Sequence, residues 1–526
     1  MDTNYAPLLA DPFLYVNDSE ISARIGKVKT RGYFPTRGTT YLTEEVISYG
    51  HVSVISLCAN AKKSRVSLNH AHKVYSLGEQ IQVQVDLYDL YGNRKLTGGD
   101  VLRVWMENPE TAASVSSRVS DHNNGSYTAL LRAAWSGSAT IKAFIASRKE
   151  EVVLSYMIYQ QHGSLWTVLA EFRANNLTDA TACSVRQGNS FKTNEWCNFT
   201  NENNGYSWYC KKSKIKQLTC DTWSHSFSAN DNMSFHLNNT ERSILDWPLA
   251  ALKQDVLQSS VRVSVGGGPK GVKLSAPSTS CSALPAEMTW RRTSPNGYFH
   301  QNKWHSLLCT DTLPRTIDAY RQCLKGRRLW LHGDSTSRQF KEVLHSILRF
   351  PSHSDRHVPV TDTDLIHKFS ISYHAHELPF YHGPRHFKKS VNQAQYIMVD
   401  RLPNTTKDIV VLNMYAHFVF VHPDVFRRHV QRLVPSVRNL LARAPNVTIA
   451  VRGPHAFFTP MRGVLSYWGN LYTDIWHEEF ASLQDKIVYL DFWDLTMAKP
   501  SQNIHPNTAI VKEMVHNMMS LLCFRK

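Results

Sequence analysis

The chain has 526 residues, which is too long for one ordinary core, so we expect two or three domains. A hydrophobic content of 42% and an aromatic content of 11% exclude extended disorder as the main state. Lys and Arg outnumber Asp and Glu by 59 to 43, and the formal net charge of +16 favours acidic partners or a solvated basic surface.

The first predicted region, residues 1–50, is polar and rich in turns, and we expect a loosely held arm. Its start has no apolar signal-peptide core, and the chain has no apolar run of about 18 residues, so no membrane span is predicted. Asparagine sequons nevertheless favour the secretory pathway, so we expect a leader upstream. The sequons are at Asn17, Asn124, Asn176, Asn198, Asn232, Asn238, Asn404 and Asn446.

The second predicted region, residues 51–160, has short strands. Apolar and polar side chains alternate at positions 81–87, which is typical of a half-buried strand. Turn signals near residues 91–93 and 121–126 separate it from further strands, and this spacing predicts a β-sandwich. The segment from Asp121 to Thr128 resembles filamin-type immunoglobulin-like repeats. Such domains usually bind partners or separate other domains, so we assign no catalytic role to this one.

The third predicted region, residues 161–296, is a connection that holds closely spaced cysteines. Cys183, Cys197, Cys210 and Cys220 are spaced too widely and evenly for zinc ligands, which come in tight pairs. Disulfides are the better interpretation, and they imply an oxidising compartment. The four cysteines allow three pairings, which the sequence leaves open. With nine cysteines in all, at least one thiol is free or pairs with another chain.

The last predicted region, residues 297–526, alternates short strands with amphipathic helices. Positions 327–332 and 408–412 are predicted strands, and positions 336–349 carry a helical apolar stripe. A second stripe at 430–441 contains Pro435, where a kink is expected. This alternation predicts a doubly wound α/β sheet, in which functional residues gather at the C-terminal ends of the strands. The predicted fold is multidomain, an immunoglobulin-like β-sandwich followed by an α/β domain.

A candidate nucleophile lies between a predicted strand and a predicted helix, in Gly333-Asp334-Ser335. A serine there points its Oγ into the crevice, where backbone N–H groups at the helix start can stabilise an oxyanion. The alternative is a purely structural role, in which Gly333 allows the tight turn and Ser335 caps the helix. The strand before the motif and the apolar stripe after it favour catalysis.

A serine nucleophile needs a base within hydrogen-bond reach. Among 25 histidines, His505 follows the last clear strand and precedes a closing helical segment. His417, His422 and His455 compete because they also follow strands. The sequence therefore favours His505 as the base.

Two further polar residues end predicted strands. Asn413 could donate its amide to an oxyanion, or it could simply terminate its strand. Arg452 could hold an anionic substrate, or it could pair with a local carboxylate. Both alternatives stay open for each residue.

Segments 330–339, 411–413, 451–455 and 504–506 together resemble the NXPE family, the neurexophilin and PC-esterase domain proteins. The resemblance extends over nearly the whole chain, with a neurexophilin-type module, a cysteine-bearing connection and a PC-esterase domain. It implies an SGNH-type fold related to glycan O-acetyltransferases and esterases. It also implies that Ser335 is the nucleophile, His505 the base and Asn413 the oxyanion-hole asparagine. Gly333 and Asp334 would support them.

The sequence departs from the wider superfamily at Gln502, where an aspartate is expected three residues before the base. A neutral glutamine can orient an imidazole but cannot stabilise an imidazolium. Asp494 or Asp491 would then be the acid, or the domain is catalytically weak. For the oxyanion-hole glycine, Gly383 is the sole candidate.

The leading expectation is acyl transfer to or from glycan hydroxyls through an acyl-Ser335 intermediate, as O-acetyltransferase or O-acetylesterase. An acidic glycan such as sialic acid would suit the basic surplus, and a transferase would need an acetyl donor such as acetyl-CoA. We expect no bound cofactor or metal. The alternative is a secreted glycoprotein that binds a cell-surface partner and carries an inactive SGNH-like scaffold. Either protein would be secreted or reside in the Golgi lumen, and neither would bind nucleic acid.

Overall fold

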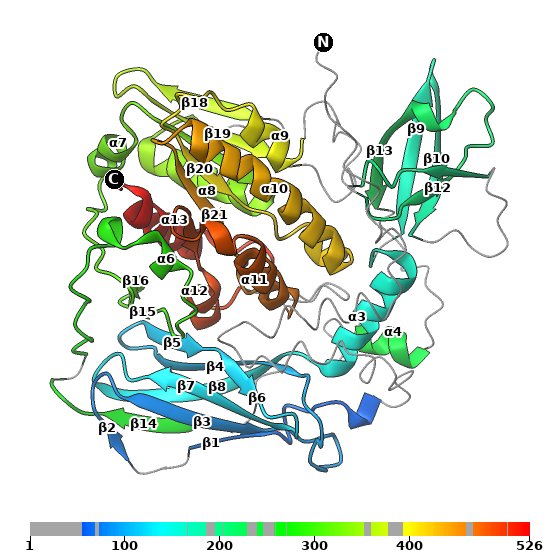
Figure 1. Ribbon diagram of the computed structural model, residues 1–526. Coiled ribbons are helices and arrows are strands. Elements are labelled where there is room, and N and C mark those ends of the chain that lie inside the picture. Colours follow the sequence, from blue (N-terminus) through cyan, green and yellow to red (C-terminus); the bar gives the residue numbers. More distant parts are fainter. Residues whose placement is uncertain are drawn as a thin grey trace.

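The structure is a computed structural model that describes residues 55–68, 73–165, 167–185, 195–203, 205–228, 239–245, 257, 259–269, 271–351, 359–376, 393–458, 467–501 and 503–525. Within these residues the N-terminal part is β-rich and the C-terminal part is α/β (Figure 1). The predicted arm at 1–50 lies outside them.

Two sheets form the first β-rich unit. The four-stranded sheet has the order β1 (Arg65–Leu68), β3 (Gln80–Asp86), β7 (Ser126–Arg132) and β6 (Val119–Asp121). The seven-stranded sheet has the order β16 (Lys303–Ser306), β15 (Gly297–His300), β5 (Ala113–Ser117), β4 (Val101–Asn108), β8 (Gly137–Ser147), β14 (Val261–Val265) and β2 (Val74–Tyr75).

One apolar core joins these two sheets. Ile81, Val83 and Val85 of β3 are fully buried, whereas the alternating Gln80 and Gln82 are exposed, as the period-two pattern predicts. Val104 and Met106 of β4 belong to the same buried cluster. The predicted alternation therefore places one face of each sheet in a shared core.

Two segments lie elsewhere than their predicted regions suggest. Strand β14, from the predicted connection, pairs with β8 and β2 in the seven-stranded sheet. Strands β15 and β16, at the start of the predicted α/β region, form a hairpin that joins the same sheet through β5. The pairings of β14 with β8 and β2, and of β15 with β5, join residues that are far apart in the sequence, and local patterns do not reveal such pairings.

A second β-rich unit holds the cysteine cluster. Its five-stranded sheet follows helix α3 (Lys149–His162) and has the order β11 (Trp196–Asn198), β12 (Tyr209–Lys211), β10 (Leu177–Ser184), β9 (Val168–Ala174) and β13 (Trp223–Ser228). Cys183 and Cys210 face each other across β10 and β12 and form a disulfide. Cys197 pairs with Cys220, so the predicted disulfides are confirmed. Helix α4 (Asn239–Leu245) packs against α3.

Two more disulfides lie toward the C-terminus. Cys281 pairs with Cys309. Cys323 of α7 (Ile317–Leu324) pairs with Cys523 just after α13 (Thr508–Leu522), across a sequence separation of 200. The ninth cysteine, Cys58, is buried and free, and burial raises the pKa of its thiol well above the usual value. The odd count thus leaves one free thiol, as predicted.

The C-terminal sheet is parallel except at one edge. Its order is β18 (Val360–Asp364), β19 (Phe369–Ala375), β17 (Arg328–Gly333), β20 (Ile409–Leu412), β21 (Thr448–Arg452) and β22 (Val488–Leu490), and β18 is the antiparallel strand. Its helices are α6 (Ala286–Thr289), α7 (Ile317–Leu324), α8 (Ser335–Leu348), α9 (Gln395–Asp400), α10 (Pro423–Arg443), α11 (Tyr467–Glu479), α12 (Trp493–Ala498) and α13 (Thr508–Leu522).

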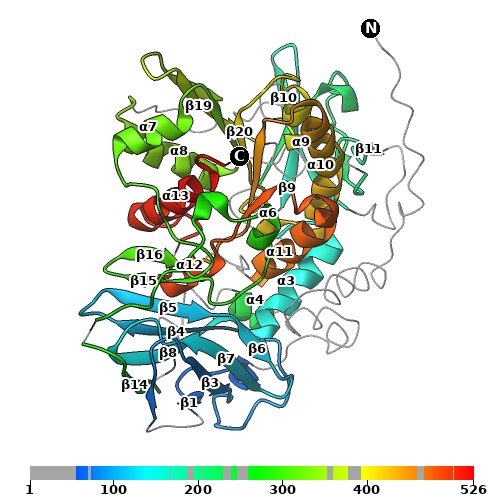
Figure 2. The same ribbon diagram turned by 60° about the vertical axis from the view of Figure 1, so that its left-hand side comes forward.

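Helices cover both faces of this sheet. On one face, Val410 and Leu412 of β20 share a core with α10 and α11. On the other face, Ile409 and Val411 share a core with α8 and α13 (Figures 1 and 2). Helix α10 continues through Pro435. Within the described residues, no helix is both long enough and apolar enough to cross a membrane.

The first β-rich unit is hydrogen-bonded to helix α12, which precedes the loop that carries His505. Arg103 of β4 donates hydrogen bonds to the carbonyls of Met497 and Ala498. Ser116 Oγ of β5 donates to the Asp494 carbonyl at 3.0 Å. The position of α12 therefore depends on side chains from the N-terminal sheet.

Candidate functional site

The candidate site lies at the point where the strand order of the parallel sheet reverses. The chain passes from β17 to β19 on one side and then to β20 on the other. Loops that leave the C-terminal ends of neighbouring strands diverge at such a point, and ligands bind in the resulting crevice. Ser335 follows β17 and Asn413 follows β20, so both lie at this crevice.

The turn from β17 into α8 presents Ser335 at the first position of the helix. Asp334 is the N-cap, and its side chain accepts a hydrogen bond from Thr336 N. Gly333 ends the strand where the backbone passes close to β20. A Cβ at Gly333 would lie 2.8 Å from the Asn413 carbonyl oxygen and would also collide with Ser337 Oγ. Glycine is therefore required for close packing at this turn.

Ser335 and His505 meet in the structure. Ser335 Oγ lies 2.5 Å from His505 Nε2, although 170 positions separate them in the chain. His505 comes from the loop between α12 and α13, and Ser335 is 9% exposed. The two side chains have the hydrogen-bond contact that a nucleophile and its base need.

Burial lowers the pKa of His505 below its usual value, although the nearby Asp334 charge acts in the opposite direction. A neutral imidazole at neutral pH can accept a proton from Ser335 Oγ. The environment of His505 thus favours the form that a general base requires.

The competing histidines have other contacts. His417 Nδ1 lies 3.3 Å from His376 Nε2. His422 Nδ1 accepts a hydrogen bond from Asp424 N and caps α10. His455 Nε2 lies 2.8 Å from the Ile504 carbonyl oxygen. Of the four predicted candidates, only His505 is hydrogen-bonded to Ser335 in the described structure.

Asp334 is a buried anchor for the turn. Its carboxylate accepts hydrogen bonds from the backbone and hydroxyl of Thr336, the amide of Asn413, and the backbone N–H groups of Tyr415 and Ala416. Burial alone would raise its pKa, but His417, Arg452 and these donors outweigh burial and hold the pKa well below the usual value. A permanent negative charge therefore ties β17 to the loop after β20.

The Asn413 amide is held inside this anchor. Its Nδ2 lies 3.2 Å from Asp334 Oδ1, 3.2 Å from Thr336 Oγ1 and 3.1 Å from Ser337 Oγ. The side chain is 1% exposed. In this geometry the Asn413 amide braces the turn, and its role as an oxyanion donor stays a prediction. The backbone N–H of Ser335, the first of α8, makes no hydrogen bond within the described residues, so it could serve as an oxyanion donor.

Arg452 is also turned inward, and it is 1% exposed. Its Nη1 donates to Thr336 Oγ1 at 2.8 Å, and its guanidinium lies 4.2 Å from the centre of the Phe340 ring. Burial lowers its pKa to about 10, whereas the Asp334 charge opposes the shift. Of the two predicted alternatives, the geometry favours interaction with a local carboxylate, which here is Asp334 through Thr336.

The predicted acid Asp494 lies in a different environment. Its Oδ2 accepts from Asn296 N at 2.9 Å and its Oδ1 lies 3.3 Å from Ser294 Oγ, so it braces the segment before β15. Asp491 pairs with Arg118 at 3.1 Å. Within the described residues, no carboxylate is hydrogen-bonded to His505, so neither aspartate orients the base. Gln502 and Gly383 lie outside the described residues.

Some supporting residues were not predicted from sequence. Gln395 of α9 donates to the carbonyls of His332 and Asn413 at 2.9 and 2.8 Å, which clamps the ends of β17 and β20. Thr336 lies within segment 330–339 of the family resemblance, which gives it no role of its own. His455 was considered only as a base, and its position after a strand was the one signal available. Among the described residues, no cluster of His, Cys, Asp or Glu could hold a metal.

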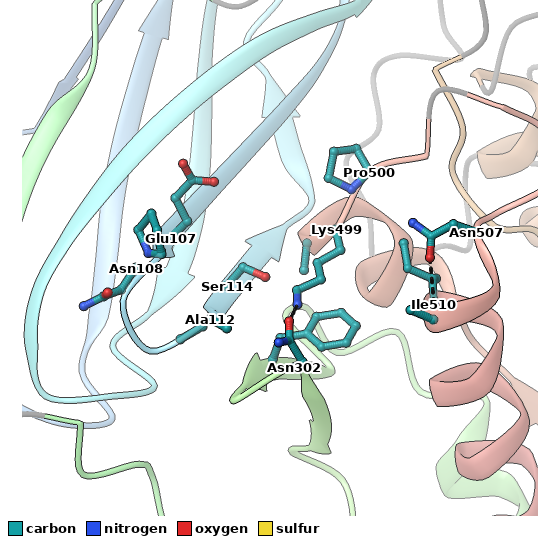
Figure 3. A pocket seen from close by; sticks show the side chains of 14 residues that line it. Glu107, Asn108, Ala112, Ser114, Asn302, Lys499, Pro500, Asn507 and Ile510 are labelled. Carbon is teal, nitrogen blue, oxygen red and sulfur yellow. Dashed lines mark hydrogen bonds between the residues drawn. The ribbon is translucent and has the colours of Figure 1, made fainter.

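A cavity of about 480 Å³ lies beside the loop that carries His505. Lys499 and Pro500 line it from the start of that loop and Asn507 from its end, while Asn108 lies on the opposite wall (Figure 3). The Lys499 ammonium is hydrogen-bonded to Asn302 at the base of the cavity. The cavity therefore lies between the first β-rich unit and the loop that carries His505.

Comparison with known families adds one finding. Residues 304–523 match the family model described as "NXPE family member 4-like, C-terminal domain". The matched segment includes both Ser335 and His505.

Proposed function

Residues 304–523 place the chain in the NXPE family, whose C-terminal domain they form, and on this premise we propose that the chain catalyses serine-dependent acyl transfer on glycan hydroxyls. The observation that carries the proposal is the 2.5 Å contact between Ser335 Oγ and His505 Nε2 at the switch point of a parallel sheet. A strand–Gly-Asp-Ser–helix turn with a late histidine supports an SGNH-type domain.

In the proposed mechanism, His505 Nε2 accepts the Ser335 Oγ proton as the oxygen attacks the acyl carbonyl. The Ser335 N–H, at the positive end of α8, stabilises the oxyanion. Protonated His505 then gives its proton to the leaving group, and an acyl-Ser335 ester remains. In the second half, His505 deprotonates a sugar hydroxyl for transfer or water for hydrolysis, and either attack releases Ser335.

The acceptor we propose is an acidic glycan, and the cavity beside the His505 loop could hold part of it. Its volume of about 480 Å³ is within the range of small-ligand pockets. The Lys499 ammonium would attract an acid group. For a transferase, the donor would be a thioester such as acetyl-CoA.

The proposed location is the secretory-pathway lumen or the extracellular space. Disulfides form and persist in oxidising compartments, and the chain has four. The first β-rich unit, with two sheets on one core, is consistent with an immunoglobulin-like module.

The test is Ser335→Ala, His505→Ala and the double variant. Each single variant should lower acyl transfer at least ~10³-fold, and the double should be no worse, because the two residues act as a unit. The assay measures O-acetyl groups on glycans released from cells that display sialylated glycoproteins. Ser346→Ala, an exposed serine of the same helix, is the matched control and should retain full activity. A folded, fully active Ser335→Ala protein would refute the mechanism.

One observation favours a second candidate function. No carboxylate among the described residues is hydrogen-bonded to the His505 ring, which is the arrangement expected of a scaffold that has lost catalysis. The protein would then bind a cell-surface partner. If the wild type changes O-acetylation on no glycan class, this second function is the better one.

A further inference from the structure

The two residues that flank His505 are each held through a backbone carbonyl. His455 Nε2 lies 2.8 Å from the Ile504 oxygen. Gln339 Nε2, on the second turn of α8, donates to the Pro506 oxygen at 2.9 Å. The base is thus fixed from both sides by groups on β21's C-terminal loop and on the helix that begins with Ser335.

The hydrogen bonds also define the protonation of His455. A carbonyl oxygen only accepts, so Nε2 must carry the proton and Nδ1 the lone pair. His455 Nδ1 lies 3.4 Å from Arg452 Nη2, and a guanidinium nitrogen can only donate, so Nδ1 is the acceptor. Burial and the Arg452 charge lower the pKa of His455 to about 3, so the ring stays neutral at any working pH.

Arg452 connects His455 to the nucleophile turn. Arg452 Nη1 donates to Thr336 Oγ1 at 2.8 Å, and Thr336 Oγ1 donates to Asp334 Oδ1 at 2.5 Å. Asp334 and Thr336 are the immediate neighbours of Ser335 in the chain. A continuous series of buried hydrogen bonds therefore runs from the turn that holds Ser335 to the residue before His505.

We propose that His455, backed by Arg452, and Gln339 are positioning residues that hold the His505 ring against Ser335. The inference rests on the proposed function, because it concerns how the same base is oriented. These side chains fix the backbone around His505 and thereby do the orienting that a carboxylate behind the ring does in a triad. They supply no charge to the imidazolium, so their effect is on geometry alone.

The first test measures the reaction of Ser335 with a fluorophosphonate probe, in which Oγ displaces fluoride from phosphorus and its proton passes to His505. His455→Phe keeps a ring but removes the donor, and we expect a labelling rate 10- to 100-fold lower with unchanged probe affinity, since misplacement by about 1 Å costs about that much. His455→Gln retains an N–H donor and should recover most of the rate. His429→Phe, at another buried histidine, should label at the wild-type rate.

Gln339→Leu is the second variant, because a half-buried position on α8 should tolerate leucine even if His455→Phe does not fold. It should slow labelling about 10-fold without lowering the melting temperature by more than a few degrees. A purely structural role would change the melting temperature and leave the labelling rate of folded protein unaltered.

The second test does not depend on activity. Diethyl pyrocarbonate carbethoxylates accessible, neutral histidine nitrogens, and mass spectrometry follows the rate at His505. That rate should rise in His455→Phe and Gln339→Leu but not in His429→Phe. If the wild type does not label at Ser335 but the His505 rate still rises, the proposed function fails and the positioning role stands. If labelling and carbethoxylation are both unchanged in folded His455→Phe and Gln339→Leu, the inference is wrong.

Discussion

The substitution Asp334→Asn tests how much the turn depends on its buried charge. The wild-type carboxylate accepts five hydrogen bonds, three on Oδ1 and two on Oδ2. Asparagine keeps the shape but has a single acceptor oxygen. Whichever way the new amide is turned, its NH₂ group faces donors, either those of Thr336 and Asn413 or the backbone N–H groups of Tyr415 and Ala416.

The expected cost follows from these contacts. A buried donor left without an acceptor costs about 1–3 kcal/mol. The charge of buried Arg452, which reaches Asp334 through Thr336, also loses its counterpart, and removing one partner of a buried charge pair costs about 3–5 kcal/mol. We expect Asp334→Asn to lower the free energy of unfolding by about 3–5 kcal/mol, a large part of the ~5–15 kcal/mol typical of a domain.

The measurement is urea unfolding followed by tryptophan fluorescence, with the slope compared between variants to check that the transition is the same. Asp485→Asn removes an exposed carboxylate and is the matched control, expected within about 0.5 kcal/mol of the wild type. Equal unfolding midpoints for Asp334→Asn and Asp485→Asn would refute the reasoning.

Two further predictions concern stability. Replacing Cys323 and Cys523 with serine opens a loop of 200 residues and should cost about 5 kcal/mol, against about 3.5 kcal/mol for Cys183 and Cys210 with a separation of 27, as measured by urea unfolding of each double variant. Equal losses would contradict this loop-length argument. Burial lowers the pKa of His429, His455 and His477 to about 3, so as pH falls below 6.5 only the unfolded chain takes up these protons. Stability should therefore decrease with falling pH, by about 2 kcal/mol per histidine at pH 5, and a pH series of unfolding midpoints that stays flat from 7 to 5 would contradict it.

The parts of the site that sequence could predict are those set by local pattern. The strand, the Gly-Asp-Ser turn and the apolar stripe of α8 are consecutive, so Ser335 could be placed on a strand-to-helix turn before the structure was known. The late position of His505, together with the family resemblance, identified the histidine that contacts Ser335. Apolar alternation likewise predicted the buried face of β3.

The remaining contacts depend on distances across the fold. Asp494 follows a strand as a triad acid could, but its partners Ser294 and Asn296 come from a segment about 200 positions earlier. The pairing of β15 with β5 and the choice among three cysteine pairings are also long-range. The contact that links His455 to the His505 loop is with the Ile504 carbonyl, and residue type alone does not indicate a backbone partner.

The β15–β16 hairpin has a consequence for biosynthesis. Strand β5 pairs with β4 on one side, and its partner on the other side, β15, is synthesised much later. At about 5–20 residues per second, the ribosome needs roughly 10–40 s to pass from Ser117 to Gly297. During that interval the nascent chain presents an open strand edge, which invites pairing with other chains. The need for chaperones should therefore be highest while β5 has paired with β4 but β15 has not yet been synthesised. A translational pause before Gly297 should lower the yield of folded protein.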